Sequence, residues 1–131
     1  MEGYPFTVAV AVRWRDLDPL GHVNNAVFVT YLEVARAELW RRLGGGEGTA
    51  IPFVVARVEM DYRRPVTLGQ RVEVGVALER IGSTSFTLRY RIEADGTVAA
   101  EARSVQVAVD ASGRPAPVSG SLRRALETLL P

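Results

Sequence analysis

The chain has 131 residues, 47% of them hydrophobic and 24% charged, with a formal net charge of +1. This composition is ordinary for a globular protein of one domain (residues 1–131), and the charge gives no case for nucleic acid or an anionic membrane as partner. The absence of cysteine excludes disulfides, thiolate metal sites and cysteine nucleophiles. With no signal-peptide pattern and no apolar run long enough to span a membrane, a cytoplasmic location is the default expectation.

The first third of the chain predicts a strand, a turn and a long helix. Residues 6–14 are rich in valine and aromatic residues, which favours a strand, and Pro19 and Gly21 then break the pattern. The stretch 26–43 predicts a helix that ends at the glycine run 44–46, because its apolar residues recur at steps of three and four. This stripe consists of Phe28, Leu32, Ala35, Leu39 and Leu43, and a neighbouring row of Val27, Tyr31 and Val34 indicates burial on much of the circumference.

The remainder of the chain is mostly predicted strand. Apolar and polar residues alternate in the runs 57–63, 71–78 and 86–93, with hairpin turns at 81–84 and 94–97. A last strand covers 98–110, and its apolar phase shifts near Arg103 and Ser104, which indicates a bulge. Ser119 or Ser121 caps a short amphipathic helix that runs to Leu130.

This order of elements predicts an α+β fold. A single helix buried on several sides needs a sheet that curls around it, and here about five strands are available. Such a sheet leaves edges that a second protomer could pair, so a dimer is compatible with the pattern.

The turn before the long helix gathers the groups best suited to catalysis. Asp18 could act as a general base toward water or as a nucleophile toward an activated acyl group. The alternative is that Asp16 and Asp18 only cap the turn. Free backbone N–H groups near Asn24 and Asn25, at the helix N-terminus, could stabilise an oxyanion, and a role of these asparagines as N-caps is compatible with that.

His22 is the only histidine of the chain, so any catalytic triad must use it. There is no Gly-x-Ser-x-Gly motif, which argues against a serine hydrolase. One histidine among scattered carboxylates is a poor ligand set, so neither a catalytic metal nor a cofactor is expected. His22 could orient a substrate carbonyl or the attacking water, or it could hold the turn through a backbone hydrogen bond.

Two stretches of the sequence carry a resemblance to a known family. The segment Asp18–Asn25 followed by 31–36, and the later residues 60–66, 68–69 and 81–85, resemble HotDog-fold acyl-CoA thioesterases of the 4-hydroxybenzoyl-CoA thioesterase group. The resemblance covers roughly Val8 to Asp110. It implies a five-stranded antiparallel sheet wrapped around one long central helix. It also implies homodimers with active sites at the subunit interface, often paired into homotetramers.

The resemblance also assigns roles within the turn. The second aspartate of the family's turn is catalytic, which is Asp18 here, so Asp16 would be supporting. The backbone N–H that polarises the thioester carbonyl falls on Asn25. The turn is also similar to that of plant acyl-carrier-protein thioesterases, which supply a catalytic Asp, Asn and His. Asp18 and His22 match that pattern, but Leu20 replaces the asparagine, so a full Asp/Asn/His mechanism does not fit.

The sequence therefore predicts hydrolysis of acyl-CoA thioesters to a free acid and CoA. Tyr31 would line the acyl pocket, or simply pack in the core. Arg63 and Arg64 would meet the CoA phosphates, or simply be exposed to solvent. Two rival functions remain open: a non-catalytic acyl-CoA binding or sensing module, and a HotDog hydratase or dehydratase that acts on enoyl-CoA.

Overall fold

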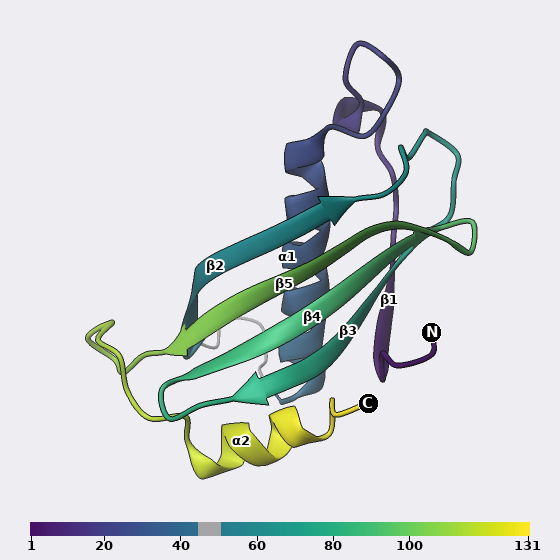
Figure 1. The fold of residues 1–131 in the computed structure, drawn as a ribbon. Helices are drawn as coiled ribbons and strands as arrows, with labels where there is room; N and C mark the ends of the chain where they lie inside the picture. The colour runs from purple at the N-terminus through teal and green to yellow at the C-terminus, as the bar shows by residue number, and fades with distance from the viewer. Residues whose placement is uncertain (45–50) are drawn as a thin grey trace.

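The computed structural model describes residues 1–44 and 51–131, in which a five-stranded antiparallel sheet packs with two α-helices (Figure 1). The strands lie in the order β1-β3-β4-β5-β2. Their bounds are β1 Phe6–Val10, β2 Phe53–Tyr62, β3 Val72–Ile81, β4 Ser85–Ala94 and β5 Thr97–Ala108. Helix α1 (Asn25–Arg42) runs across one face of the sheet, and α2 (Gly120–Glu127) lies at the end of the molecule away from the start of α1. The predicted α+β class with five strands is confirmed.

Helix α1 follows the predicted stripe closely. Its inward residues Phe28, Leu32, Ala35 and Leu39 are all buried against the sheet, and Leu43 is partly buried. The second predicted row is wrong at Val34, whose side chain is 43% exposed, because this side of α1 is not covered by the sheet. Gly44 has a φ of +104°, a conformation suited to ending a helix, whereas residues 45 and 46 of the predicted stop lie outside the described residues.

The first strand is shorter than predicted. β1 ends at Val10, and Trp14–Asp16 form a 3₁₀ turn instead of continuing the strand. The turn forms because the buried carboxylate of Asp16 accepts the backbone N–H of Arg13 at 2.9 Å and bends the chain back. Trp14, the last residue of the predicted strand, is 80% exposed.

The bulge predicted near Arg103 and Ser104 lies in β2, the partner strand of β5, and not in β5 itself. The register of β5 with β4 is unbroken there, but its register with β2 shifts opposite Val105 and Gln106, where Ala56 of β2 is the extra residue. The apolar phase only looked shifted because two polar residues, Ser104 and Gln106, occupy inward positions and are fully buried. The irregularity of β5 lies at its other end, where Ala99 is the extra residue in the pairing with β4.

The two hairpins and the C-terminal helix agree with the sequence pattern. The β4–β5 turn has φ values of +50° at Asp95 and +80° at Gly96, as a two-residue type I′ hairpin requires. Ser119 caps α2 by accepting the N–H of Leu122 at 3.1 Å, although the helix ends at Glu127 and not at Leu130. Across the described chain, none of the helices has the length and hydropathy needed to cross a membrane.

Candidate active site

The turn before α1 is a small hairpin closed by a bridge between Leu17 and Val23. The N–H of Asp18 donates to the carbonyl of His22 at 2.7 Å, and the side-chain Oδ1 of Asp18 accepts the N–H groups of Leu20 at 2.9 Å and His22 at 3.1 Å. Asp18 therefore does cap the turn, but through one oxygen. Its Oδ2 makes no hydrogen bond within the described part of the chain, so one carboxylate oxygen is left for chemistry.

This hairpin is fixed to the segment that follows β2. Val23 donates its N–H to the carbonyl of Val66 at 2.8 Å, and His22 forms a bridge with Thr67. On the other side, the N–H of Asn24 donates to the carbonyl of Asp16 at 2.9 Å. The turn, the start of α1 and the end of β2 consequently meet at one end of the sheet (Figure 1).

The buried side chain of Asp16 holds the turn through hydrogen bonds. It is 1% exposed, and besides the backbone N–H of Arg13 it accepts hydrogen bonds from the Arg13 guanidinium at 2.9 Å and from the Tyr31 hydroxyl at 2.8 Å. Burial by itself raises the pKa of Asp16, but these hydrogen bonds outweigh it and hold the pKa below the ordinary value of 3.8. Burial and the neighbouring carboxylate raise the pKa of Tyr31 well above 10, so its hydroxyl stays a neutral donor.

The depressed pKa of Asp16 should make the free energy of unfolding depend on pH in the acid range. Because its pKa is depressed in the folded state, its stabilising contribution is present above the ordinary value of 3.8 and is lost as the pH falls through the folded-state pKa. We expect Asp16→Asn to lower the free energy of unfolding at pH 7 by roughly 2–3 kcal/mol and to flatten its decline below pH ~4. Urea denaturation at pH 7 and below pH ~4 measures both effects. A free energy of unfolding that falls equally with pH in the wild type and in the variant would contradict the assignment.

A cavity of about 360 Å³ opens beside the turn, bounded by the turn, the first turn of α1 and the residues after β2. It brings together five of the six residues that the sequence singled out: Asp18, His22, Asn25, Arg63 and Arg64. The sixth, Tyr31, is not among its lining residues, because the side chain points to Asp16 inside the core. Leu20 borders the cavity where the plant enzymes' asparagine would stand.

The N-terminus of α1 presents a free backbone donor at this cavity. The side chain of Asn24 caps the helix by accepting the N–H of Ala26 at 2.8 Å. Asn25 is the first residue of α1, and its own N–H has no acceptor among the residues the structure describes. The positive end of the helix dipole lies at the same point, so an anionic oxygen would be stabilised there.

Tyr62 is a site residue that the sequence reasoning missed. Its hydroxyl donates to the carbonyl of Asn25 at 2.9 Å, and its ring packs edge-on against Phe28 with centroids 5.2 Å apart. The end of β2 is thereby tied to the first turn of α1. The alternating pattern had placed Tyr62 only as an apolar strand residue; its position directly before the two arginines was the available signal.

His22 lines the cavity, and its imidazole has no hydrogen-bond partner in the described chain. Only its backbone takes part in the bonding of the turn. The side chain is thus not needed to hold the turn, and it is available to a substrate or a water molecule.

The two arginines differ in how their charges are compensated. Both backbone N–H groups donate to the carbonyl of Ala99, at 2.8 Å for Arg63 and 3.1 Å for Arg64, so the extra residue of β5 sets their position. The guanidinium of Arg63 lies 3.6 Å from Glu101 and 3.9 Å from Asp61. Arg64 forms no ion pair with any described carboxylate, which leaves its charge for an external anion.

The same turn geometry occurs a second time, away from the cavity. At Asp110, Oδ1 accepts the N–H groups of Ser112 at 2.9 Å and Arg114 at 3.1 Å, and Gly113 has a φ of +82° where Gly21 has +79°. The second turn is exposed and borders neither the cavity nor a helix N-terminus. An aspartate in this turn therefore does not make a site by itself; the cavity and the free N–H of Asn25 distinguish the first copy.

Chemically, the cavity offers a carboxylate, an imidazole and a free N–H at a helix end. Within residues 1–44 and 51–131, no three His, Asp or Glu side chains are grouped so that they could hold a metal ion.

Comparison with known proteins gives consistent matches over nearly the whole chain. The family described as the thioesterase-like superfamily matches residues 12–126. The long-chain acyl-CoA thioesterase FadM of Escherichia coli K12 is 33% identical over 130 residues, which cover 92% of this chain and 96% of FadM. A thioesterase from Thermus thermophilus, solved with coenzyme A and Zn, is 45% identical, with a TM-score of 0.89 and coverage of 98% and 96%. A predicted thioesterase from Bacillus stearothermophilus is 32% identical, with a TM-score of 0.87 and coverage of 95% and 96%.

Proposed function

The chain belongs to the thioesterase-like superfamily, a family of HotDog-fold acyl-CoA thioesterases, and from this premise we propose that it hydrolyses acyl-CoA thioesters with Asp18 as the catalytic carboxylate. One observation carries the proposal: Asp18 and Asn25, whose N–H has no acceptor among the described residues, border the same cavity of about 360 Å³. A carboxylate and an oxyanion donor on the two sides of a carbonyl are the minimum that acyl transfer to water requires.

The reaction forms one C–O bond and breaks one C–S bond. With Asp18 as general base, its carboxylate takes a proton from water while the water oxygen attacks the thioester carbonyl carbon. The carbonyl oxygen becomes an oxyanion that accepts the N–H of Asn25, and collapse of the intermediate expels CoA thiolate, which receives the proton. With Asp18 as nucleophile, its carboxylate attacks the carbonyl carbon and expels CoA thiolate. Water then attacks the mixed anhydride and breaks its bond to Asp18, which gives the acid and restores the carboxylate, and the proton released from water passes to the CoA thiolate. In both routes His22 orients the reacting groups, and Asp16 and Tyr31 hold the turn.

The direct test is CoA release measured with a thiol reagent over a panel of acyl-CoA substrates. FadM is named as a long-chain acyl-CoA thioesterase, so the panel should run from short to long aliphatic chains and include aromatic acyl groups. We expect CoA release from at least one class. Tight acyl-CoA binding with no CoA release would favour a binding module, and hydration of enoyl-CoA would favour a hydratase.

Arg64, and Arg63 beside it, would bind the phosphates of CoA at the mouth of the cavity. The uncompensated guanidinium of Arg64 is the better candidate, because Arg63 already has carboxylate neighbours. We expect Arg64→Gln to raise KM about tenfold with little change in kcat, since one charge-assisted contact is lost in both ground and transition states. Steady-state kinetics check this, with the exposed Arg80→Gln as control; equal KM values for both variants would remove Arg64 from the CoA site.

We also propose that a second copy of the chain pairs with β2, giving a homodimer and, by a further pairing, a homotetramer. Among the strands of the described residues, β2 is hydrogen-bonded only to β5, so its other edge is open to a partner. Val55, Val58 and Tyr62 stand opposite buried residues of β5 yet are exposed themselves, and Tyr62 also borders the cavity. Pairing here would wrap the sheet further around α1 and place the active site at the interface. A monomeric mass in sedimentation equilibrium would contradict this pairing.

The cytoplasmic location and the single domain remain predictions from the sequence.

A further inference from the structure

Tyr62 connects the sheet to the end of the helix that carries the proposed oxyanion donor. It is the last residue of β2, is 43% exposed and borders the catalytic cavity. Its hydroxyl donates to the carbonyl of Asn25 at 2.9 Å. Its ring packs edge-on against the buried ring of Phe28, with the centroids 5.2 Å apart. The contact with Phe28 therefore fixes the place of a partly exposed hydroxyl at the start of α1.

The backbone groups on both sides of the Asn25 N–H are held by hydrogen bonds from nearby residues. The N–H of Asn24 donates to the carbonyl of Asp16 at 2.9 Å, and the carbonyl of Asn24 accepts the N–H of Val27 at 2.9 Å. The N–H of Ala26 donates to Oδ1 of Asn24 at 2.8 Å. The N–H of Asn25 lies between these groups and has no acceptor among the described residues. One free donor is thus left in a segment whose neighbouring groups are bonded.

The carbonyl of Asn25 completes this set of bonded groups, because it accepts the Tyr62 hydroxyl. The other three bonds come from the turn and from α1 itself, so Tyr62 supplies the one bond of the four that reaches the sheet. The ends of helices fray, and a bond to a second element opposes this. Since the hydrogen of the Tyr62 hydroxyl is directed at the backbone, the hydroxyl does not donate to a substrate and would act through Asn25.

We propose that Tyr62 is a positioning residue for the hydrolysis of acyl-CoA. It holds the first turn of α1 to the sheet, so that the N–H of Asn25 meets the oxyanion in a fixed orientation. The inference rests on the proposed function, because it takes Asn25 as the oxyanion donor. A donor of this kind lowers the barrier only if it is aimed before the reaction begins, and a small displacement is costly. The same hydroxyl should add little to stability, since water can replace it at an exposed position.

The first test is the kinetics of Tyr62→Phe, which removes the hydroxyl and keeps the ring at the cavity. We expect kcat to fall about tenfold with KM nearly unchanged and Tm little altered, because the lost interaction matters in the transition state. In the Asn25→Pro background, which lacks the N–H, the same substitution should change kcat no further. An unchanged kcat in the single variant, or an equal loss in both backgrounds, would overturn the proposal.

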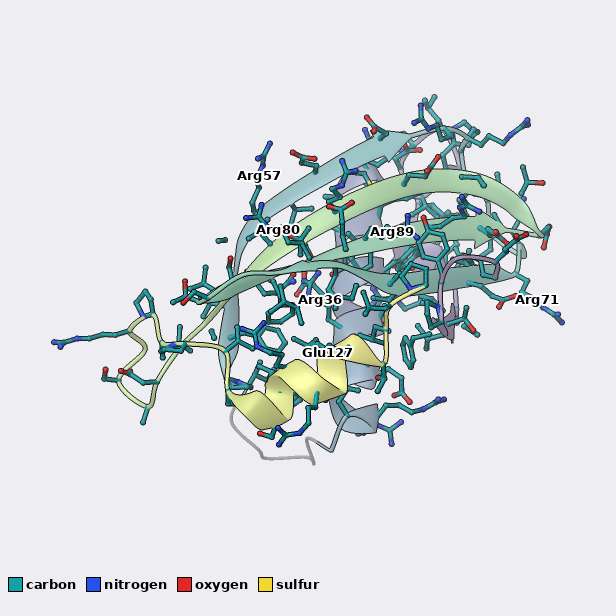
Figure 2. The ribbon with its side chains drawn as sticks, turned by 60° about the horizontal axis from the view of Figure 1, so that its bottom comes forward. Arg36, Arg57, Arg71, Arg80, Arg89 and Glu127 are labelled. Carbon is teal, nitrogen blue, oxygen red and sulfur yellow. The ribbon has the colours of Figure 1, made fainter. Side chains whose placement is uncertain are left out.

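Tyr4→Phe is the matched control, because it removes a tyrosine hydroxyl that does not border the catalytic cavity. The ring of Tyr4 lies 5.1 Å from the guanidinium of Arg89, an arginine of β4 in the middle part of the sheet (Figure 2). The Tyr4 hydroxyl makes no hydrogen bond within the described chain. Its removal should leave kcat at the wild-type value.

Nitrogen-15 relaxation of the Asn25 amide tests the positioning without any substrate. We expect an order parameter of about 0.85 in the wild type, as in rigid backbone, and a decrease toward ~0.6 in Tyr62→Phe. Equal order parameters in the two proteins would show that Tyr62 does not hold this amide. If the wild type released no CoA, the proposed function would fail, whereas a rigid amide that loosens in Tyr62→Phe would still show the contact at work.

Discussion

The Asp18→Asn variant is expected to hydrolyse acyl-CoA about 10²-fold or more slowly than the wild type while it folds normally. The amide retains an oxygen that can accept the N–H groups of Leu20 and His22, so the turn is preserved. It can neither accept the proton of a water molecule nor attack a thioester. The loss should therefore appear in kcat, measured by thiol release at saturating substrate, with the circular dichroism spectrum unchanged.

Asp110→Asn is the matched control for this experiment. Asp110 has the same backbone bonds, and its Oδ1 accepts the N–H groups of the second and fourth residues after it, with one further hydrogen bond from the Ser112 hydroxyl at 2.6 Å; it does not border the cavity. If replacing aspartate by asparagine disturbs this kind of turn, both variants should show the effect. We expect wild-type kcat from Asp110→Asn; near-wild-type kcat from Asp18→Asn would remove Asp18 from the mechanism.

The second large effect is expected from Asn25→Pro, which deletes the backbone N–H assigned to the oxyanion. Removal of one such donor costs about 10²–10³-fold in kcat in enzymes where it has been measured. Proline is tolerated at the first position of a helix, where the N–H has no intrahelical partner. The preceding residue, Asn24, already has the extended conformation (φ −61°, ψ 142°) that proline requires before it. The fold should therefore survive the change.

Two further variants separate loss of the N–H from loss of structure. Asn25→Ala removes the side chain but keeps the N–H, so its kcat should exceed that of Asn25→Pro by most of the expected factor. Gly120→Pro makes the same change at the first position of α2, where Ser119 is the extended N-cap. It should leave kcat unaltered. Equal activities of Asn25→Pro and Asn25→Ala would show that this N–H does not stabilise the oxyanion.

The α-helices and hairpins could be predicted because the signals for them are local. The apolar stripe of α1 repeats at the period of one helix, and Asp95 and Gly96 permit the positive φ values of a tight hairpin. Other predictions failed where the pattern of polar and apolar residues does not record burial. Buried Ser104 and Gln106 interrupted the apolar alternation of β5, and exposed Val34 was placed in the core. Their burial depends on which surfaces of other elements reach them, which no local pattern records.

The candidate site shows the same division between features that local sequence patterns predict and features that tertiary packing sets. The sequence by itself determined the turn that holds Asp18 and His22, its place directly before α1, and the family to which they point, because these groups lie within a few residues of one another. Only the tertiary structure decided that Tyr62 reaches Asn25 across 37 positions of the chain, and that Arg64 borders the cavity while Tyr31 turns inward to Asp16. Such contacts follow from strand register and from the direction of each side chain, and both are set only when the whole sheet packs onto the helix.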